Sequence, residues 1–188
     1  MSRAECDGCG RPESVCLCSH LVHYTLPFNL TIWQDPDESR HPLSTAPLLE
    51  RTIDGCRRLG GGHFAYNDIF SGAPVETVAL LYPADDSVDV VGPEIGRDRV
   101  SHVLVLDGTW RKVRRLTLMN PWLLNLPRVS LSPQTPSAYL RTSQHESGVS
   151  TLEAVLMLAD LWYPGNAYLE GTGVLQRMSE LQERMRKR

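Results

Sequence analysis

Four cysteines near the start of the chain have the spacing of a metal site. Cys6, Cys9, Cys16 and Cys18 form the pattern C-x2-C-x6-C-x-C. The alternative, a pair of disulfides, requires an oxidising compartment, and the first residues lack the apolar core of a secretion signal. We therefore expect a structural Zn²⁺ site, because four thiolates leave no open coordination position. The fifth cysteine, Cys56, is expected to be a core thiol.

A second candidate lies where an apolar run, residues 103–106, meets Asp107, Gly108 and Thr109. Open α/β sheets bind ligands where buried strands end, so this turn is a candidate active site. Asp107 could instead be a helix cap, but Thr109 is the better placed cap, which leaves Asp107 available for chemistry. Trp110 begins the next helical segment, either as a core residue or as a wall for a cofactor.

The third candidate is the long loop 139–151, which is rich in small residues. Its amides and hydroxyls could hold a small polar ligand, and a bare surface loop is the alternative. The loop leads into a capping box in which Ser150 and Glu153 satisfy each other's backbone amides.

Three arginines are spaced to share one helix face. Arg111, Arg114 and Arg115 stand at positions i, i+3 and i+4. Such a face is either solvated or a rim that contacts phosphates.

Periodicity predicts the elements that must position these residues. Short strands alternate with helices, which is typical of an α/β fold with a mostly parallel sheet and helices on both faces. Periodicity does not distinguish a doubly wound order from a knotted one. We expect strands at residues 30–33, 75–82, 102–106 and 128–131, and helices at 46–59, 109–119, from 150 to the break at 164–165, and from about 167 onward.

Composition limits the classes of function. The 188 residues suffice for one domain and a small appendage, which we expect to divide into a zinc-binding head, 1–24, and a catalytic domain, 25–188. The net charge of −3 argues against nucleic-acid binding by bulk charge, so RNA binding would need a local patch. No apolar run is long enough for a membrane helix, and a cytoplasmic protein is expected.

Four sets of residues resemble the DTW-domain family. Asp107 to Trp110 match the D-x-T-W signature, and residues 150–154 match an S-T-x-E-A helix start. The cysteine head is similar to that of other members. Residues 35–38, followed by Ser44 and Thr45, resemble the family's H-P-x-E and S/N-T segments. Asp35 departs from the pattern, because the family usually has His there.

The resemblance implies a tRNA-uridine aminocarboxypropyltransferase with a SPOUT-like trefoil knot. Such enzymes move the 3-amino-3-carboxypropyl group of S-adenosylmethionine to N3 of a uridine, and a monomer acting on tRNA is expected. Asp107 would be the base, and Trp110 would pack against the sulfonium. Arg111, Arg114 and Arg115 would contact RNA. The residues expected around S-adenosylmethionine are Thr45, Leu81, Tyr82, Pro83, Leu106, Trp110, Tyr139, Leu140, Arg141, Ser150 and Thr151.

Two alternatives remain. One is an S-adenosylmethionine-dependent RNA methyltransferase of the knotted class, which would transfer the methyl group of the same donor. The other is a non-enzymatic, zinc-headed RNA-binding module, which would have no affinity for the donor.

Overall fold

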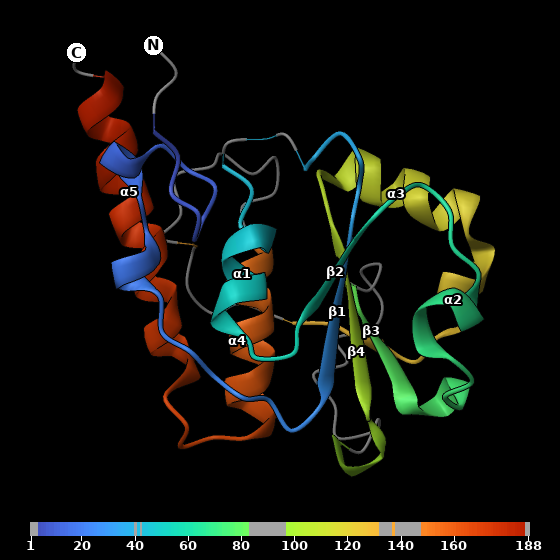
Figure 1. Cartoon of the computed structure of the whole chain (residues 1–188). Coiled ribbons are helices and arrows are strands. Elements are labelled where there is room, and N and C mark those ends of the chain that lie inside the picture. Colours follow the sequence, from blue (N-terminus) through green and yellow to red (C-terminus); the bar gives the residue numbers. More distant parts are fainter. Residues whose placement is uncertain are drawn as a thin grey trace.

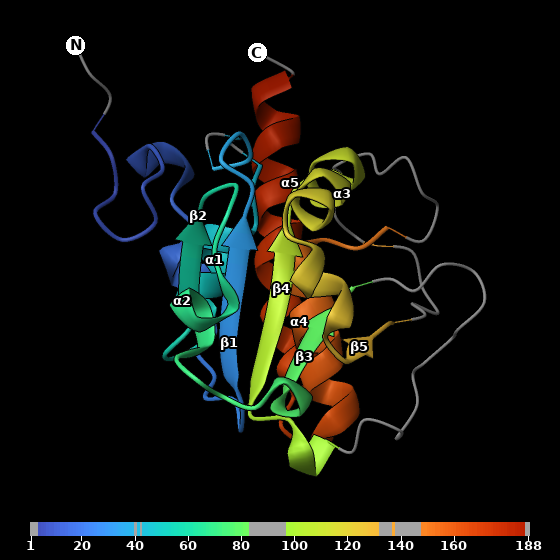
Figure 2. The ribbon, with the colours of Figure 1, turned by 90° about the vertical axis from the view of Figure 1, so that its right-hand side faces the viewer.

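The computed structural model describes residues 4–39, 41, 43–82, 97–131, 137 and 148–186. Within these residues the strands form one five-stranded sheet, in which every pair is parallel and the order is β2-β1-β4-β3-β5 (Figures 1 and 2). The strands are β1 (Asn29–Gln34), β2 (Arg57–Gly60), β3 (Val78–Leu81), β4 (His102–Asp107) and β5 (Arg128–Val129). The α-helices are α1 (Ala46–Thr52), α2 (Tyr66–Phe70), α3 (Trp110–Met119), α4 (Thr151–Trp162) and α5 (Gly173–Arg186).

Helices cover both faces of this sheet, as predicted. Figure 1 shows α1, α4 and α5 on one side, and α2 and α3 on the other. The strand residues alternate between two apolar clusters: Val103 and Val105 of β4 belong to the first, whereas Leu104 and Leu106 belong to the second. This alternation follows from the two-residue period of a strand, and burial on both faces explains why β4 is a continuous apolar run.

The connections diverge between the adjacent strands β1 and β4. After β1 the chain passes through α1 to β2 on one side of the sheet, and after β4 it passes through α3 to β5 on the other. At this switch point the carboxyl ends lie side by side, because Gln34 is paired in register with Asp107. Open α/β sheets bind ligands at such a point.

The predicted helix 46–59 is wrong in its second half. The helix α1 ends at Thr52, Gly55 has a φ of 72°, and the chain then enters the edge strand β2. This edge strand contains two arginines and is only partly buried, so it lacks the apolar signal of a core strand. The predicted strand 75–82 is shorter than expected, because a turn of 3₁₀-helix, Val75–Thr77, precedes β3. The sequence did not predict α2.

The cysteine head packs onto the main body of the protein. It contains two 3₁₀ turns, Glu13–Val15 and Cys18–His20, and Leu17 between them is fully buried in the cluster under α1, α4 and α5. The Arg11 guanidinium lies 3.5 Å from the sulfur of Met178 on α5. The expected last helix begins as 3₁₀-helix, Tyr168–Thr172, and continues as α5. Among the described helices, none has the length and apolar character needed to cross a membrane.

The implied trefoil knot depends on how the chain runs from β5 to α4. Residues 132–136 and 138–147 of that connection lie outside the described residues. The knot therefore stays a prediction.

Candidate active site

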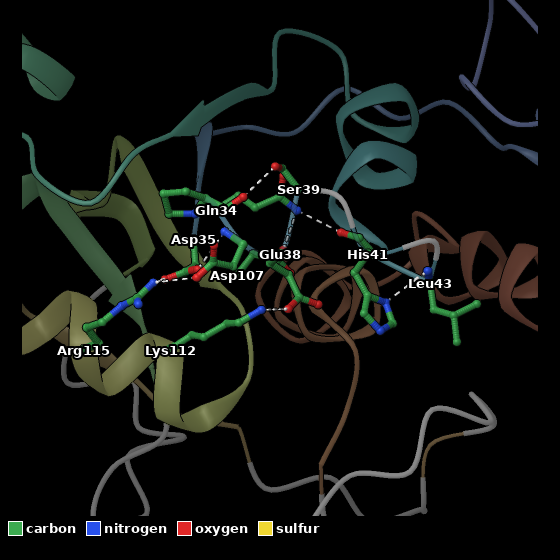
Figure 3. Close-up of polar contacts among 12 residues, drawn as sticks. Gln34, Asp35, Glu38, Ser39, His41, Leu43, Asp107, Lys112 and Arg115 are labelled. Carbon is green, nitrogen blue, oxygen red and sulfur yellow. Dashed lines mark hydrogen bonds and ion pairs between the residues drawn. The ribbon is translucent and has the colours of Figure 1, made fainter.

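Asp107, the last residue of β4, lies at the centre of the candidate site and is 5% exposed (Figure 3). Gln34 Nε2 donates a hydrogen bond of 2.8 Å to Asp107 Oδ2. The hydroxyl of Thr151, the first residue of α4, donates to Asp107 Oδ1. Donors from two other elements thus hold both oxygens, which favours the ionised carboxylate and fixes its orientation.

Four segments that resemble family motifs lie together around Asp107. Thr151 belongs to the S-T-x-E-A segment and bonds Asp107 of the D-x-T-W segment. Thr45 of the S/N-T segment accepts a 3.4 Å hydrogen bond from the Leu152 amide. The Asp35 amide donates to the Asp107 carbonyl at 2.9 Å. Segments far apart in sequence therefore build one site.

The loop after β1 is joined to α3 by two ion pairs. Arg115 Nη2 lies 2.6 Å from Asp35 Oδ2, and Lys112 Nζ lies 3.0 Å from Glu38 Oε2 (Figure 3). Both carboxyl side chains are fully buried. A Cβ atom at Gly108 would lie 3.2 Å from Lys112 Cβ and 3.4 Å from Asp35 Cβ, so the glycine permits this close approach.

The expected cationic face of α3 is only partly available. Arg111 and Arg114 are exposed, whereas Arg115 pairs with Asp35 and, at 3.3 Å, with Asp37. The hydrogen bond to Asp35 is the main cause that raises the pKa of Arg115. Arg115 therefore anchors the loop after β1, and its charge is compensated within the protein.

Two expectations about helix capping have different outcomes. The capping box of α4 is confirmed: the Glu153 amide donates to Ser150 Oγ at 3.2 Å, and the Ser150 amide donates to Glu153 Oε2 at 2.8 Å. The expected cap at Thr109 is wrong in its chemistry, because Thr109 occupies the N-cap position of α3 but its side chain makes no capping hydrogen bond. The Asp107 carboxylate accepts hydrogen bonds from Gln34 and Thr151.

The other residues expected to contact S-adenosylmethionine lie in different parts of the structure. Trp110 is 40% exposed at the start of α3, next to the Asp107 turn. Leu81 packs in the cluster on the α4 side, whereas Leu106 packs in the opposite cluster. The Tyr82 amide continues the sheet with a 3.0 Å bond to the Val129 carbonyl. Pro83, Tyr139, Leu140 and Arg141 lie outside the described residues.

The four cysteines of the head come together as the spacing predicts. The sulfur atoms of Cys6, Cys9, Cys16 and Cys18 all lie within 4.8 Å of one another, and none forms a disulfide. Three of the separations are 3.4, 3.7 and 3.8 Å. A tetrahedral site with Zn–S bonds of about 2.3 Å has sulfurs about 3.8 Å apart, so the cluster fits a zinc ion.

Cys56 lies in the turn before β2 and packs against the core, as expected. Burial raises the pKa of its thiol to about 12, which disfavours the reactive thiolate.

The sheet and its polar switch point define an α/β protein whose candidate ligand site lies at the carboxyl ends of β1 and β4. The model of the DTW domain matches residues 3–184, so the chain belongs to the DTW-domain family. No solved structure matches the chain.

Several relatives are named tRNA-uridine aminocarboxypropyltransferases. The enzyme named tRNA-uridine aminocarboxypropyltransferase 2 from Drosophila melanogaster is 32% identical over 80% of this chain and 63% of its own length. Its namesake from Macaca fascicularis is 27% identical over 90% of this chain and 60% of its own length. The enzyme named tRNA-uridine aminocarboxypropyltransferase A from Arabidopsis thaliana is 27% identical over 61% of this chain and 50% of its own length. The chain thus spans between 50% and 63% of the length of these relatives.

Proposed function

We propose that this protein transfers the 3-amino-3-carboxypropyl group of S-adenosylmethionine to N3 of a uridine in tRNA. Membership of the DTW-domain family and the printed names of its relatives support the reaction class. The observation that carries the proposal is that Gln34 and Thr151 both donate to the Asp107 carboxylate, while Thr45 accepts from the amide of Leu152, the residue after Thr151. A switch point built from these segments is suited to hold a small polar donor beside a buried carboxylate.

Asp107 is the proposed general base. The N3–H group of uridine is only weakly acidic, and a positioned carboxylate that accepts its proton makes N3 a better nucleophile. The new bond joins N3 to the γ-carbon of the donor's amino-acid chain. The bond between that carbon and sulfur breaks, its electron pair stays on sulfur, and methylthioadenosine leaves. The proton stays on Asp107 until solvent removes it.

Trp110 is proposed to select which carbon reacts. Three carbons of a sulfonium are open to attack, and geometry must hide the methyl carbon and present the γ-carbon. Trp110, three residues after Asp107 and 40% exposed, is proposed to pack against the sulfonium and its methyl group, with cation–π attraction as a further contribution. The hydroxyls of Thr45, Ser150 and Thr151 are proposed to contact the ribose or the α-carboxylate.

The head is proposed to hold one structural Zn²⁺ through Cys6, Cys9, Cys16 and Cys18. The mutual distances of the sulfurs support this assignment. The ion would stabilise a segment that has little apolar surface of its own, without a part in transfer. Arg111 and Arg114, both exposed on α3, are the proposed contacts to tRNA phosphates.

The test is nucleoside mass spectrometry of tRNA after incubation with the protein and S-adenosylmethionine. The proposal predicts an aminocarboxypropyl-uridine and methylthioadenosine, whereas a methylated base with adenosylhomocysteine would establish the methyltransferase alternative. Calorimetric titration with S-adenosylmethionine tests the binding-module alternative, which predicts no affinity. We expect binding that is lost in Trp110→Ala.

A further inference from the structure

A buried amide holds the central carboxylate of the site. Gln34 ends β1, is fully buried, and is the in-register neighbour of Asp107. Its Nε2 donates to Asp107 Oδ2 at 2.8 Å and to Ser44 Oγ at 2.8 Å. Its Oε1 accepts from Arg58 Nη1 at 3.0 Å. Both N–H groups and the carbonyl oxygen of the amide therefore have partners.

Arg58 decides which way this amide faces. A guanidinium has only donors, so the oxygen of Gln34 must point to Arg58 and the NH₂ group must point to Asp107. Arg58 is itself fixed, because its Nε lies 2.8 Å from Glu50 Oε2. A chain of polar contacts thus runs from α1 through β2 and β1 to the carboxylate at the end of β4.

From this geometry we propose that Gln34 is a positioning residue, which holds the Asp107 carboxylate ionised and oriented for the proton of the incoming uridine. The proposal rests on the proposed function. Gln34 is fully buried, so the role assigned to it runs through its hydrogen bond to Asp107 and not through contact with the substrate. A carboxylate has about four lone-pair sites, so hydrogen bonds from its neighbours do not by themselves prevent it from accepting a proton.

The hydrogen bond from Gln34 acts within a dense charge arrangement. Charged groups of both signs surround Gln34 and Asp107. The effect of one added charge on the pH dependence of kcat is therefore best measured as a difference between matched variants. The charged groups on the elements packed around Gln34 and Asp107 include Glu50 of α1, Arg58 of β2, Asp35, Asp37 and Glu38 of the loop after β1, Lys112 and Arg115 of α3, and the buried Glu153 of α4.

The decisive variant is Gln34→Glu, which keeps the size of the side chain but replaces a donor with a second carboxylate. Two carboxylates in contact disfavour each other's ionisation, so the pKa of Asp107 should rise. Since the base must be unprotonated, the acid limb of the kcat profile should shift to higher pH by at least about one pH unit. A purely structural role would lower stability without moving this limb.

Asn120→Asp is the matched control. Asn120 is also a fully buried amide and lies directly after α3, at the end of that helix away from Asp107. Its Nδ2 donates at 2.9 Å to the carbonyls of Gly62 and Leu116. This control should reduce thermal stability and leave the acid limb in place. An acid limb of Gln34→Glu that coincides with that of the wild type would overturn the proposal.

A neutral variant covers the case in which Gln34→Glu does not fold. Gln34→Met removes the hydrogen bonds at similar volume and should lower kcat about ten- to a hundredfold, with KM for tRNA nearly unchanged. An unchanged kcat would overturn the positioning role while the proposed function stands. If the wild type itself transfers nothing, the proposed function fails and this inference fails with it.

Discussion

Gly8→Ala is expected to disrupt the cysteine cluster. A Cβ at Gly8 would lie 2.6 Å from Cys18 Sγ and 3.3 Å from Cys6 Sγ. Ordinary contacts are about 3.5–4.0 Å, so the Cys18 sulfur or the loop would have to move about 1 Å. Zinc sites tolerate deviations of only about 0.2 Å. The backbone resists the shift, because Cys6 N donates to the Arg11 carbonyl at 2.8 Å and Gly10 N donates to the Cys6 carbonyl at 2.9 Å.

The assay is zinc content by mass spectrometry, followed by competition with a chromophoric chelator. We expect Gly8→Ala to lose at least about tenfold in zinc affinity and to melt at a lower temperature, since metal binding stabilises the folded head. Gly173→Ala is the control, because a Cβ at that helical glycine meets nothing within 4 Å. One equivalent of zinc bound by Gly8→Ala with wild-type affinity would refute the reasoning.

Three further outcomes are expected. Asp107→Asn should lower the transfer rate by at least about 100-fold while calorimetry finds nearly unchanged donor affinity, and near-normal turnover would exclude Asp107 as the base. Ser150→Ala removes the bond from the Glu153 amide and should cost about 1 kcal/mol in chemical denaturation; no loss would contradict the capping role. Burial, and to a smaller extent the charge of Arg57, lower the pKa of His102 below its usual value of 6.5. As pH falls through 6.5, the imidazole is therefore protonated in the unfolded chain before it is protonated in the folded protein, and the free energy of unfolding should decline. Melting temperatures from about pH 7.5 to about pH 5 should fall less in His102→Gln, and parallel curves would contradict this.

The local features of the fold could be predicted from the sequence. The strand β4 is buried on both faces, so its apolar run is unambiguous. The capping box at Ser150 and Glu153 depends only on residues three apart, which the chain itself places together. The cysteine cluster was predictable for the same reason, because all four cysteines lie within one short segment.

Elements without a strong local signal were missed or misassigned. Leu59 and Cys56 happen to fit a helical spacing, yet they lie in or beside β2, a partly buried edge strand. The extended conformation of residues 57–60 depends on their pairing with β1, which the local sequence does not reveal. The five-residue helix α2 is too short for its apolar period to stand out.

Contacts across the site could not be derived from the sequence. Asp35 and Arg115 are 80 residues apart, and Gln34 and Asp107 are 73 apart. Arg115 was predicted to contact RNA because it shares a helix face with Arg111 and Arg114. Its ion pair with Asp35 could not be predicted, because Asp35 is remote in the chain. The one signal for Gln34 was its polar side chain directly after an apolar strand, at the edge where ligands bind.

The most direct test of the proposed reaction follows two labels of the donor. The protein is incubated with tRNA and S-adenosylmethionine that carries one isotope in the carboxyl group and another in the methyl group. If the proposed transfer occurs, the carboxyl label enters the tRNA and the methyl label leaves as methylthioadenosine. Methyl label in the tRNA, with the carboxyl label in adenosylhomocysteine, would contradict it.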